Sequence, residues 1–578
     1  MSKHSIRKMV WLVCGVGLFL WLTVWQRPLH AADAVVGTGT AASCTEAAFN
    51  TALSTVQTSG GGTITFNCGG EATIPFTFEK SISTVVTIDG ANQITLNGGN
   101  STRLFLVFGG TLHLRNITLS NGFSNTNDGG AITNNGILTL DNTTIRDSRV
   151  SSNYSGGAIV NYGPLTITNS LFEDNVGGNG GALYLRFEAG GATITNSTFR
   201  HNQTTNVTNG WGGAILLWGA DVTVRQSTFF ENEARRGGAI HNLFDYAVVT
   251  LEPGNTFYNN RASDAGGALF VAGQTTIEDN TFDLNAAVNA GGAILSTVTA
   301  NLTVTQSHFH INSSLVGGGI NFSGIRLIVH DNVFDGNNAN SEGGAIYISG
   351  GDLDVERTQF VKNKAVGNGG AIGCFNAFMS VILSGLAYNE TIAGDGGAVY
   401  STCSLNMSNL TLSDNKANGV NSVGGAIHQG GDVAAFIQYA TIVDNTAVTG
   451  GGLSNGSNGS TITINKSIVA HNGGGNCSNG IGSAGYNLSN NGSCPSFTQT
   501  GDLQNATLPL APFANNGGST SSRLPLAGNQ AVDIIPLASC DFATDQRGGT
   551  RPIGSGCDSG AVEVGGFVEQ VYLPFVRK

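Results

Sequence analysis

Residues 343–363 have the sequence GGAIYISGGDLDVERTQFVKN, and the pattern in this stretch decides the fold. The stretch begins with a Gly-Gly-small-aliphatic unit and ends with a Phe-x-x-Asn motif. The first unit occurs thirteen times between residues 129 and 453, at intervals of about 27 residues, a period typical of solenoid proteins. Paired glycines allow backbone angles closed to other residues and let neighbouring coils approach closely. The first glycines of the units are Gly129, Gly156, Gly180, Gly212, Gly237, Gly266, Gly291, Gly317, Gly343, Gly369, Gly396, Gly424 and Gly450.

The Phe-x-x-Asn motif recurs in eight consecutive repeats and predicts two internal ladders. Stacked phenylalanines would fill the interior, and stacked asparagines suit turns because their side chains bond to backbone groups. Later repeats keep the asparagine and replace the ring by Leu386, Leu412 or Ile442. The phenylalanines are Phe172, Phe199, Phe229, Phe257, Phe282, Phe309, Phe334 and Phe360, and each asparagine lies three residues later.

Between glycines and ring, each repeat contains a short run in which aliphatic residues and threonines alternate. Leu165–Thr168 and Leu302–Thr305 are examples, and this period of two is typical of a strand with one buried face. No helical period competes with it in the repeats. The sequence therefore predicts an all-β chain, a single-stranded parallel β-helix of about sixteen coils, each with about three short strands.

The β-helix is expected over residues 63–472, and the segments on either side have other patterns. Residues 32–62 are expected to form an N-terminal cap, with an amphipathic helix over residues 44–57 that covers the open first coil with Ala48, Leu53 and Val56. The segments after the repeats are a Gly/Ser/Asn-rich connection at 473–500, a small module at 501–563 and a tail at 564–578.

Residues 1–31 have the features of a signal peptide. A basic start precedes an apolar run from Met9 to Trp25, and cleavage is expected after Ala31 or Ala34. Because the run is long for a signal peptide, an uncleaved anchor is the alternative. No later stretch has the ~20 apolar residues of a membrane-spanning helix. We therefore expect an exported, extracellular or cell-surface protein with no membrane span in the mature chain.

Charge and cysteine content agree with export. Residues 1–31 contain four basic and no acidic groups, so their removal changes the net charge from −12 to −16. This acidic balance argues against a nucleic-acid partner, which needs clustered Lys and Arg. Eight cysteines remain, an even number that favours disulfides in an exported chain. They form four sequence-adjacent pairs, Cys44/Cys68, Cys374/Cys403, Cys477/Cys494 and Cys540/Cys557.

The GGAI unit followed by Phe-x-x-Asn resembles the repeats of the chlamydial polymorphic outer-membrane protein family and related bacterial right-handed β-helix proteins. The resemblance covers roughly residues 60–472 and implies a right-handed coil, surface display and adhesion. Residues 501–563 resemble the bacterial choice-of-anchor domain, on the stretches Asn516–Thr520, Leu526–Asp533, Thr544–Gly548 and Asp558–Glu563. The anchoring mechanism of that domain does not carry over to the residues after 563.

We expect an adhesin-like or structural surface protein with glycans or neighbouring cell-surface molecules as partners. A structural envelope component with no ligand is one alternative. A polysaccharide lyase, hydrolase or epimerase with its substrate along the coils is another, because β-helix enzymes of this kind gather carboxylates and bases. Its candidate catalytic residues are Asp174, His201 and Glu231, which occupy equivalent positions in consecutive repeats. We prefer the hypothesis that these are solvated charges, and no cofactor or metal is predicted.

Overall fold

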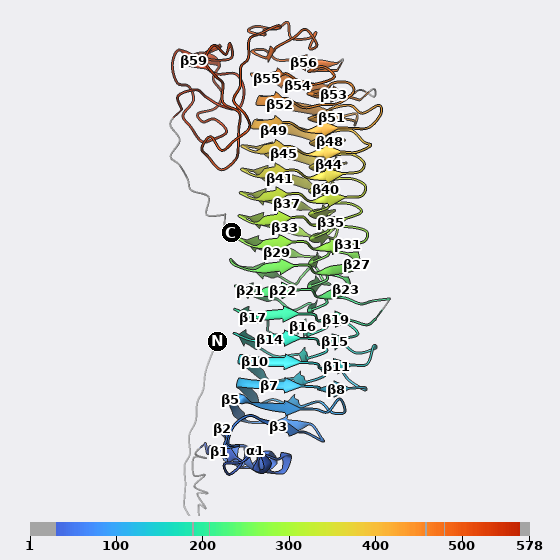
Figure 1. Ribbon diagram of the computed structural model, residues 1–578, viewed down its shortest axis with the longest axis vertical. Helices are drawn as coiled ribbons and strands as arrows, with labels where there is room; N and C mark the ends of the chain where they lie inside the picture. The colour runs from blue at the N-terminus through green and yellow to red at the C-terminus, as the bar shows by residue number, and fades with distance from the viewer. Residues whose placement is uncertain are drawn as a thin grey trace, which may run out of the picture.

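A computed structural model describes residues 31–566, apart from residues 188–189, 207, 457–458, 460 and 479. The expected signal peptide and most of the expected tail therefore lie outside the described residues. The chain is nearly all β, with 47% strand and 4% helix, and forms a parallel β-solenoid of about 17 turns (Figure 1). The predicted fold class is confirmed.

One coil contains four short strands. In the coil that begins at Gly343 these are β40 (Ile346–Ser349), β41 (Asp352–Glu356), β42 (Gln359–Val361) and β43 (Lys364–Ala365). This coil has four strands where about three were expected, because Arg357, which has a positive φ of 45°, separates β41 from β42. Each strand pairs in parallel with its equivalent in the next coil, as Ile346 does with Ile372.

The strands stack into three long sheets. Among the described residues, sheet A has 30 strands and contains both β41 and β42, whereas sheet C has 12 short strands and contains β43. Sheet B has 15 strands, one from each of 15 successive coils. In chain order these are β4 (Lys80–Ile82), β6 (Phe105–Val107), β9 (Ile132–Asn134), β12 (Ile159–Asn161), β16 (Leu183–Arg186), β20 (Ile215–Trp218), β24 (Ile240–Asn242), β28 (Leu269–Val271), β32 (Ile294–Ser296), β36 (Ile320–Phe322), β40, β44 (Ile372–Phe375), β48 (Val399–Ser401), β51 (Ile427–Gln429) and β53 (Leu453–Asn455).

The phenylalanine ladder lies inside the solenoid as expected. Neighbouring ring centroids from Phe172 to Phe360 are 4.6–5.0 Å apart, and the rings are within 10° of parallel. All eight rings are fully buried. The rings follow one another in register because each strand pairs with its exact equivalent one coil away, for example Phe229 with Phe257.

The asparagine ladder runs beside the rings and satisfies buried backbone groups. The side-chain amide of Asn260 donates to the backbone carbonyl of Phe229 at 2.9 Å and to Oδ1 of Asn285 at 3.0 Å. The backbone N–H of Asn260 also donates to Oδ1 of Asn285, at 3.0 Å. Because an unpaired buried amide costs free energy, the ladder favours an asparagine in every coil.

The two glycines of each pair have different structural roles, as Gly237 and Gly238 show. Gly237 has a φ of +61°, in the left-handed region. A Cβ atom at Gly238 would lie 2.1 Å from the carbonyl oxygen of Gly267 in the next coil. The first glycine turns the chain, and the second allows the close approach of adjacent backbones.

A helix covers the first coil. Helix α1 (Glu46–Thr58) is capped by Thr45, whose side chain accepts a hydrogen bond from the N–H of Ala48 at 3.2 Å. Phe49, Leu53 and Val56 are buried against the first strands, while Ala48 is half-buried. The predicted cap helix is confirmed, and Phe49 provides its largest buried side chain.

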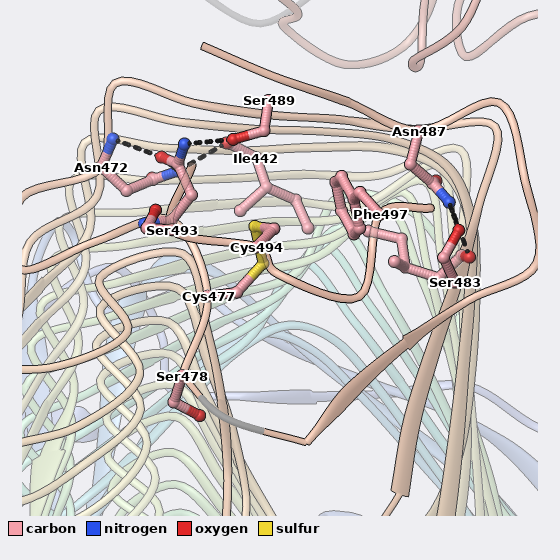
Figure 2. Close-up of a disulfide and its surroundings, with 12 residues drawn as sticks. Ile442, Asn472, Cys477, Ser478, Ser483, Asn487, Ser489, Ser493, Cys494 and Phe497 are labelled. Carbon is pink, nitrogen blue, oxygen red and sulfur yellow. Dashed lines mark hydrogen bonds between the residues drawn. A yellow bond between two sulfur atoms is a disulfide. The ribbon is translucent and has the colours of Figure 1, made fainter. Parts of the chain in front are cut away.

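The last coil is closed by residues 473–500, the segment expected as a connection. It contains β56 (Ile481–Ser483) and β57 (Leu488–Ser489), which pair with β54 (Thr461–Asn465) and β55 (Ile468–Ala470) and add a coil without the glycine motif. Figure 2 shows Phe497 and the Cys477–Cys494 disulfide at the open end of this coil. Phe497 is 3% exposed and belongs to the main core, so it closes the C-terminal end as α1 closes the N-terminal end.

Residues 501–566, which we call the C-terminal module, pack against the flank of the last coils (Figure 1). Its regular structure is sparse, with one antiparallel pair, β58 (Ile535–Pro536) and β59 (Gly556–Cys557). The side chain of Gln546 accepts from Thr411 Oγ1 at 2.6 Å and donates to the carbonyl of Ser384 at 3.2 Å. Arg551 donates to Asn409 Oδ1 at 3.0 Å. The module is thus held against sheet A.

All four expected disulfides are present, Cys44–Cys68, Cys374–Cys403, Cys477–Cys494 and Cys540–Cys557. Cys374 and Cys403 join adjacent coils, with Cα atoms 5.9 Å apart. In the part of the chain that the structure describes, no helix has the length and apolar character needed to cross a bilayer.

Candidate functional site

Asp174, His201 and Glu231, the candidates from the sequence, lie together at one corner of three consecutive coils. Each immediately precedes a ladder asparagine and has a φ of 50–55°. His201 Nε2 is 3.1 Å from Glu231 Oε2, and His201 Nδ1 is 3.6 Å from Asp174 Oδ1. The structure therefore brings the three predicted residues into contact.

This corner is open to solvent. The side chains of Asp174, His201 and Glu231 are 52%, 40% and 41% exposed. Partial burial, with the adjacent Glu173 charge, raises the pKa of Asp174. Glu173, Asp174 and His201 place ligand atoms within 4.8 Å of one another, but Glu173 is already paired with Arg200 at 2.5 Å. Exposed pairs of this kind contribute ~0–1 kcal/mol, and the arrangement fits a row of hydrated charges.

The outer face of sheet B carries residues that the sequence analysis missed. In each strand the first residue points into the core and the second points outward, as fully buried Ile346 and half-buried Tyr347 show. The signal in the sequence is the residue that directly follows each Gly-Gly-small-aliphatic unit, which is often aromatic or large. Residues of this kind and the neighbouring Tyr162, Trp211, Trp218 and Phe375 form a surface that we call the aromatic face. It consists of Val160, Tyr162, Tyr184, Trp211, Leu216, Trp218, His241, Phe270, Leu295, Tyr347, Phe375, Tyr400 and His428.

The first part of the aromatic face combines rings with a cation. Tyr184 and Trp218 make an edge-to-face contact with centroids 6.2 Å apart. The Arg186 guanidinium lies 5.2 Å from the Tyr162 ring and 5.6 Å from the Tyr184 ring. Burial raises the pKa of Tyr184 to about 12. The geometry is that of cation–π packing on a surface.

A cleft of about 330 Å³ lies beside Tyr162. Arg103 and Asp128 are charged groups in its lining, and burial raises the pKa of Asp128. Arg103 is engaged by Glu79 at 2.7 Å and by the carbonyl of Gly129 at 2.7 Å. Both contacts engage the Arg103 side chain with other residues of the protein. We therefore interpret the cleft as a structural feature beside the aromatic face and not as a binding site.

The middle of the aromatic face is a stack of three rings. His241 lies between Trp211, at 5.4 Å and 10°, and Phe270, at 4.4 Å and 15°. The imidazole is 1% exposed, and neither ring nitrogen has a hydrogen-bond partner among the described residues. Burial, with a smaller effect of the Arg236 charge, lowers the pKa of His241 to about 3. His241 is therefore a neutral aromatic ring at neutral pH.

This buried imidazole predicts a pH dependence of stability. Between about pH 6.5, the ordinary pKa of histidine, and about pH 3, the unfolded chain binds a proton that the folded chain does not. Stability from this group is therefore present above pH 6.5 and is lost as the pH falls through that window. His241→Phe is expected to keep or raise the melting temperature at neutral pH and to reduce its loss on acidification. Melting curves at several pH values check this, and an unchanged pH slope would contradict it.

The last part of the aromatic face is a row of rings along the solenoid axis. Tyr347, Phe375, Tyr400 and His428 follow one another with centroid distances of 5.1, 5.4 and 5.4 Å. The first three rings are half-buried, and His428 is 8% exposed. Burial lowers the pKa of His428 and raises the pKa values of Tyr347 and Tyr400. The row is a continuous strip of inclined aromatic rings on the outer face of sheet B.

One protein-family model matches part of the repeat region. Residues 333–349, from β38 (Val333–Asp335) to the end of β40, match the model of the Chlamydia polymorphic membrane protein repeat. The match contains one Phe-x-x-Asn position and the glycine pair that follows it. With the β-solenoid, it confirms the resemblance of the repeats. Comparison of the chain with curated proteins returns no match. The resemblance of residues 501–563 to the choice-of-anchor domain stays a prediction.

Proposed function

We propose that this chain, a β-solenoid carrying a polymorphic membrane protein repeat, is an exported, adhesin-like surface protein that attaches to its target through the aromatic face. The repeat suggests a β-helix displayed on a surface. Four disulfides suit an oxidising, extracytoplasmic environment. The observation that carries the proposal is the outward-facing rings of sheet B, which occupy most coils from β12 to β51 and are interrupted at Leu295 of β32 and Asn321 of β36.

The outer face of sheet A differs in composition from the aromatic face of sheet B. Its equivalent outward positions are mostly threonine, for example Thr166, Thr193 and Thr223, which pair in register. Short hydroxyl side chains of this kind keep a sheet hydrated. The aromatic face instead gathers half-buried rings such as Trp218, Tyr347 and Tyr400 on adjoining strands, and clustered aromatic residues on a rigid protein are typical of binding sites.

The position of the C-terminal module agrees with this proposal. Its contacts with the solenoid include Ser384, Asn409 and Thr411, which lie in or beside sheet A strands. Figure 1 shows the module on the sheet A side of the last coils, away from β44, β48 and β51. The module therefore leaves the aromatic face open. In this proposal, residues 501–566 lie on the side of the protein away from its target.

The test uses the exported full-length chain. Protease accessibility on intact cells checks surface display, and beads coated with the purified protein check attachment to a panel of cell surfaces. Trp218→Ala, Tyr347→Ala and Tyr400→Ala in one chain should abolish bead attachment with little change in the melting temperature. Phe378→Ala with Phe436→Ala removes two exposed rings, 45% and 37% exposed, from sheet A and is the matched control. Attachment that survives the triple change, or protein found only inside cells, would overturn the proposal.

A further inference from the structure

We propose that Tyr347, Phe375, Tyr400 and His428 form a linear site for a non-acidic polysaccharide, which lies along the solenoid axis with its sugar rings on the aromatic rings. The inference rests on the proposed adhesin-like function and names the class of its ligand. It depends on three features, namely the alignment of the rings, their accessibility and the chemistry of the groups beside them.

The rings are aligned by the register of sheet B. Tyr347 pairs with Gly373, Gly373 with Tyr400, and Tyr400 with His428. Gly373 interrupts the series because it has no side chain. Phe375, two residues further along β44 and on the same face, fills the gap, since a Cβ atom at Gly373 would lie 3.4 Å from its ring. Four successive coils thus each contribute one ring to an unbroken row.

The rings are also accessible. Tyr347, Phe375 and Tyr400 are half-buried, so part of each ring reaches the surface, and successive ring planes are inclined by 32–33°. Burial and nearby carboxylates raise the pKa values of Tyr347 and Tyr400. Among the described residues neither tyrosine hydroxyl forms a hydrogen bond, so both can bond with a ligand.

Carboxylates and an amide line one side of the row. Glu342, Asn368 and Asp395 precede the glycine pairs of successive coils, and Glu342 and Asp395 act electrostatically on the tyrosines. Asn368 donates to Glu342 Oε1 at 3.2 Å, and Asp395 Oδ1 accepts from the N–H of Val423 at 2.9 Å. Among the described residues, no lysine or arginine forms an ion pair with Glu342 or Asp395. Each carboxylate keeps an oxygen available.

The aromatic rings, together with the carboxylates and the amide beside them, favour some classes of ligand over others. The negative face of an aromatic ring attracts C–H groups and cations, which matches the apolar face of a pyranose ring. Carboxylate and amide oxygens accept hydrogen bonds from hydroxyl or ammonium groups at the ring edge. Two uncompensated carboxylates repel a uronic acid, so the site favours neutral or amino sugars over acidic ones. A row with one ring per coil matches a linear polymer better than a compact ligand.

Calorimetry on the exported full-length chain tests the site with three probes: cellohexaose, a glucosamine hexamer and hexagalacturonate. We expect the two non-acidic hexamers to bind and hexagalacturonate not to bind. Phe375→Ala and Tyr400→Ala should each weaken binding about tenfold. Phe378→Ala, which removes an exposed ring of the same coil from sheet A, should leave it unchanged. Glu342→Gln with Asp395→Asn should lessen the discrimination against hexagalacturonate.

Three outcomes would overturn the inference. They are binding of hexagalacturonate alone, binding of no hexamer, and non-acidic binding that survives both ring substitutions. Sedimentation adds a fourth, because a dimer that Tyr400→Ala dissociates would show that the row binds a second copy of the chain. Bead attachment separates the two proposals. If beads still attach through the aromatic face while no hexamer binds, the polysaccharide site is wrong and the adhesin-like function stands.

Discussion

Phe257→Ala is expected to destabilise the centre of the solenoid by about 3–5 kcal/mol, the cost of removing a buried phenylalanine ring. Phe257 is fully buried, and its ring lies 4.8 Å from Phe229 and 4.9 Å from Phe282. The cavity would interrupt a ladder in which Phe257 packs against the ring before it and the ring after it. Because repeat proteins are stabilised by nearest-neighbour contacts, the loss should concentrate in the adjoining coils.

Hydrogen exchange measures this effect coil by coil. Protection should fall most in the strands that contain Phe229, Phe257 and Phe282, and limited proteolysis should find new cleavage sites there. Phe378→Ala is the control, since that ring is 45% exposed on sheet A and its loss leaves no cavity. Equal protection in Phe257→Ala and the parent protein would contradict the internal ladder.

Glu563→Gln is expected to release the C-terminal module from the solenoid, at a cost on the order of 3–5 kcal/mol. The Glu563 carboxylate is fully buried and accepts hydrogen bonds from Arg551 Nε at 3.1 Å and from the backbone N–H of Ile553 at 2.8 Å. Arg551 also lies 4.3 Å from the Tyr439 ring of the solenoid. Without the negative charge of Glu563, the buried positive charge of Arg551 has weaker electrostatic compensation. Arg551 lies beside the solenoid surface that the module contacts.

The measurement is hydrogen exchange and proteolysis within residues 501–566. In the variant both should increase there, while the ladder coils keep their protection. The matched control is Glu390→Gln, which breaks an exposed pair with Lys364 at 3.3 Å, worth ~0–1 kcal/mol. Protection of residues 501–566 that is equal in the two variants would show that the buried pair does not hold the module.

Several features of the structure could be predicted from the sequence because they repeat once per coil. In a parallel solenoid, residues one period apart contact each other. The spacing of Phe229 and Phe257 in the sequence therefore predicts that their side chains are in contact. The same reasoning places Cys374 beside Cys403 and Asn260 beside Asn285. It also brought Asp174 to His201, although their exposure follows from the corner on which they lie.

The aromatic face was harder to predict, although its signal is present in the repeats. Tyr347 and Tyr400 follow their glycine units at the same offset, but Phe375 lies two residues later, because Gly373 occupies that position. A search for aromatic residues at one fixed offset therefore misses the continuous row. Whether a residue beside the core points inward or outward depends on where the turn ends, which the alternation alone does not define.

The sequence by itself determined the coil, its period, its two internal ladders and the Cys374–Cys403 pair, because each depends on contacts between neighbouring repeats. The tertiary structure alone decided where the C-terminal module lies and which face stays open. Thr411 and Gln546 are 135 residues apart and hydrogen-bond at 2.6 Å, and no periodicity relates them. Such a contact depends on the complementary shape and charge of two surfaces that exist only once both parts have folded.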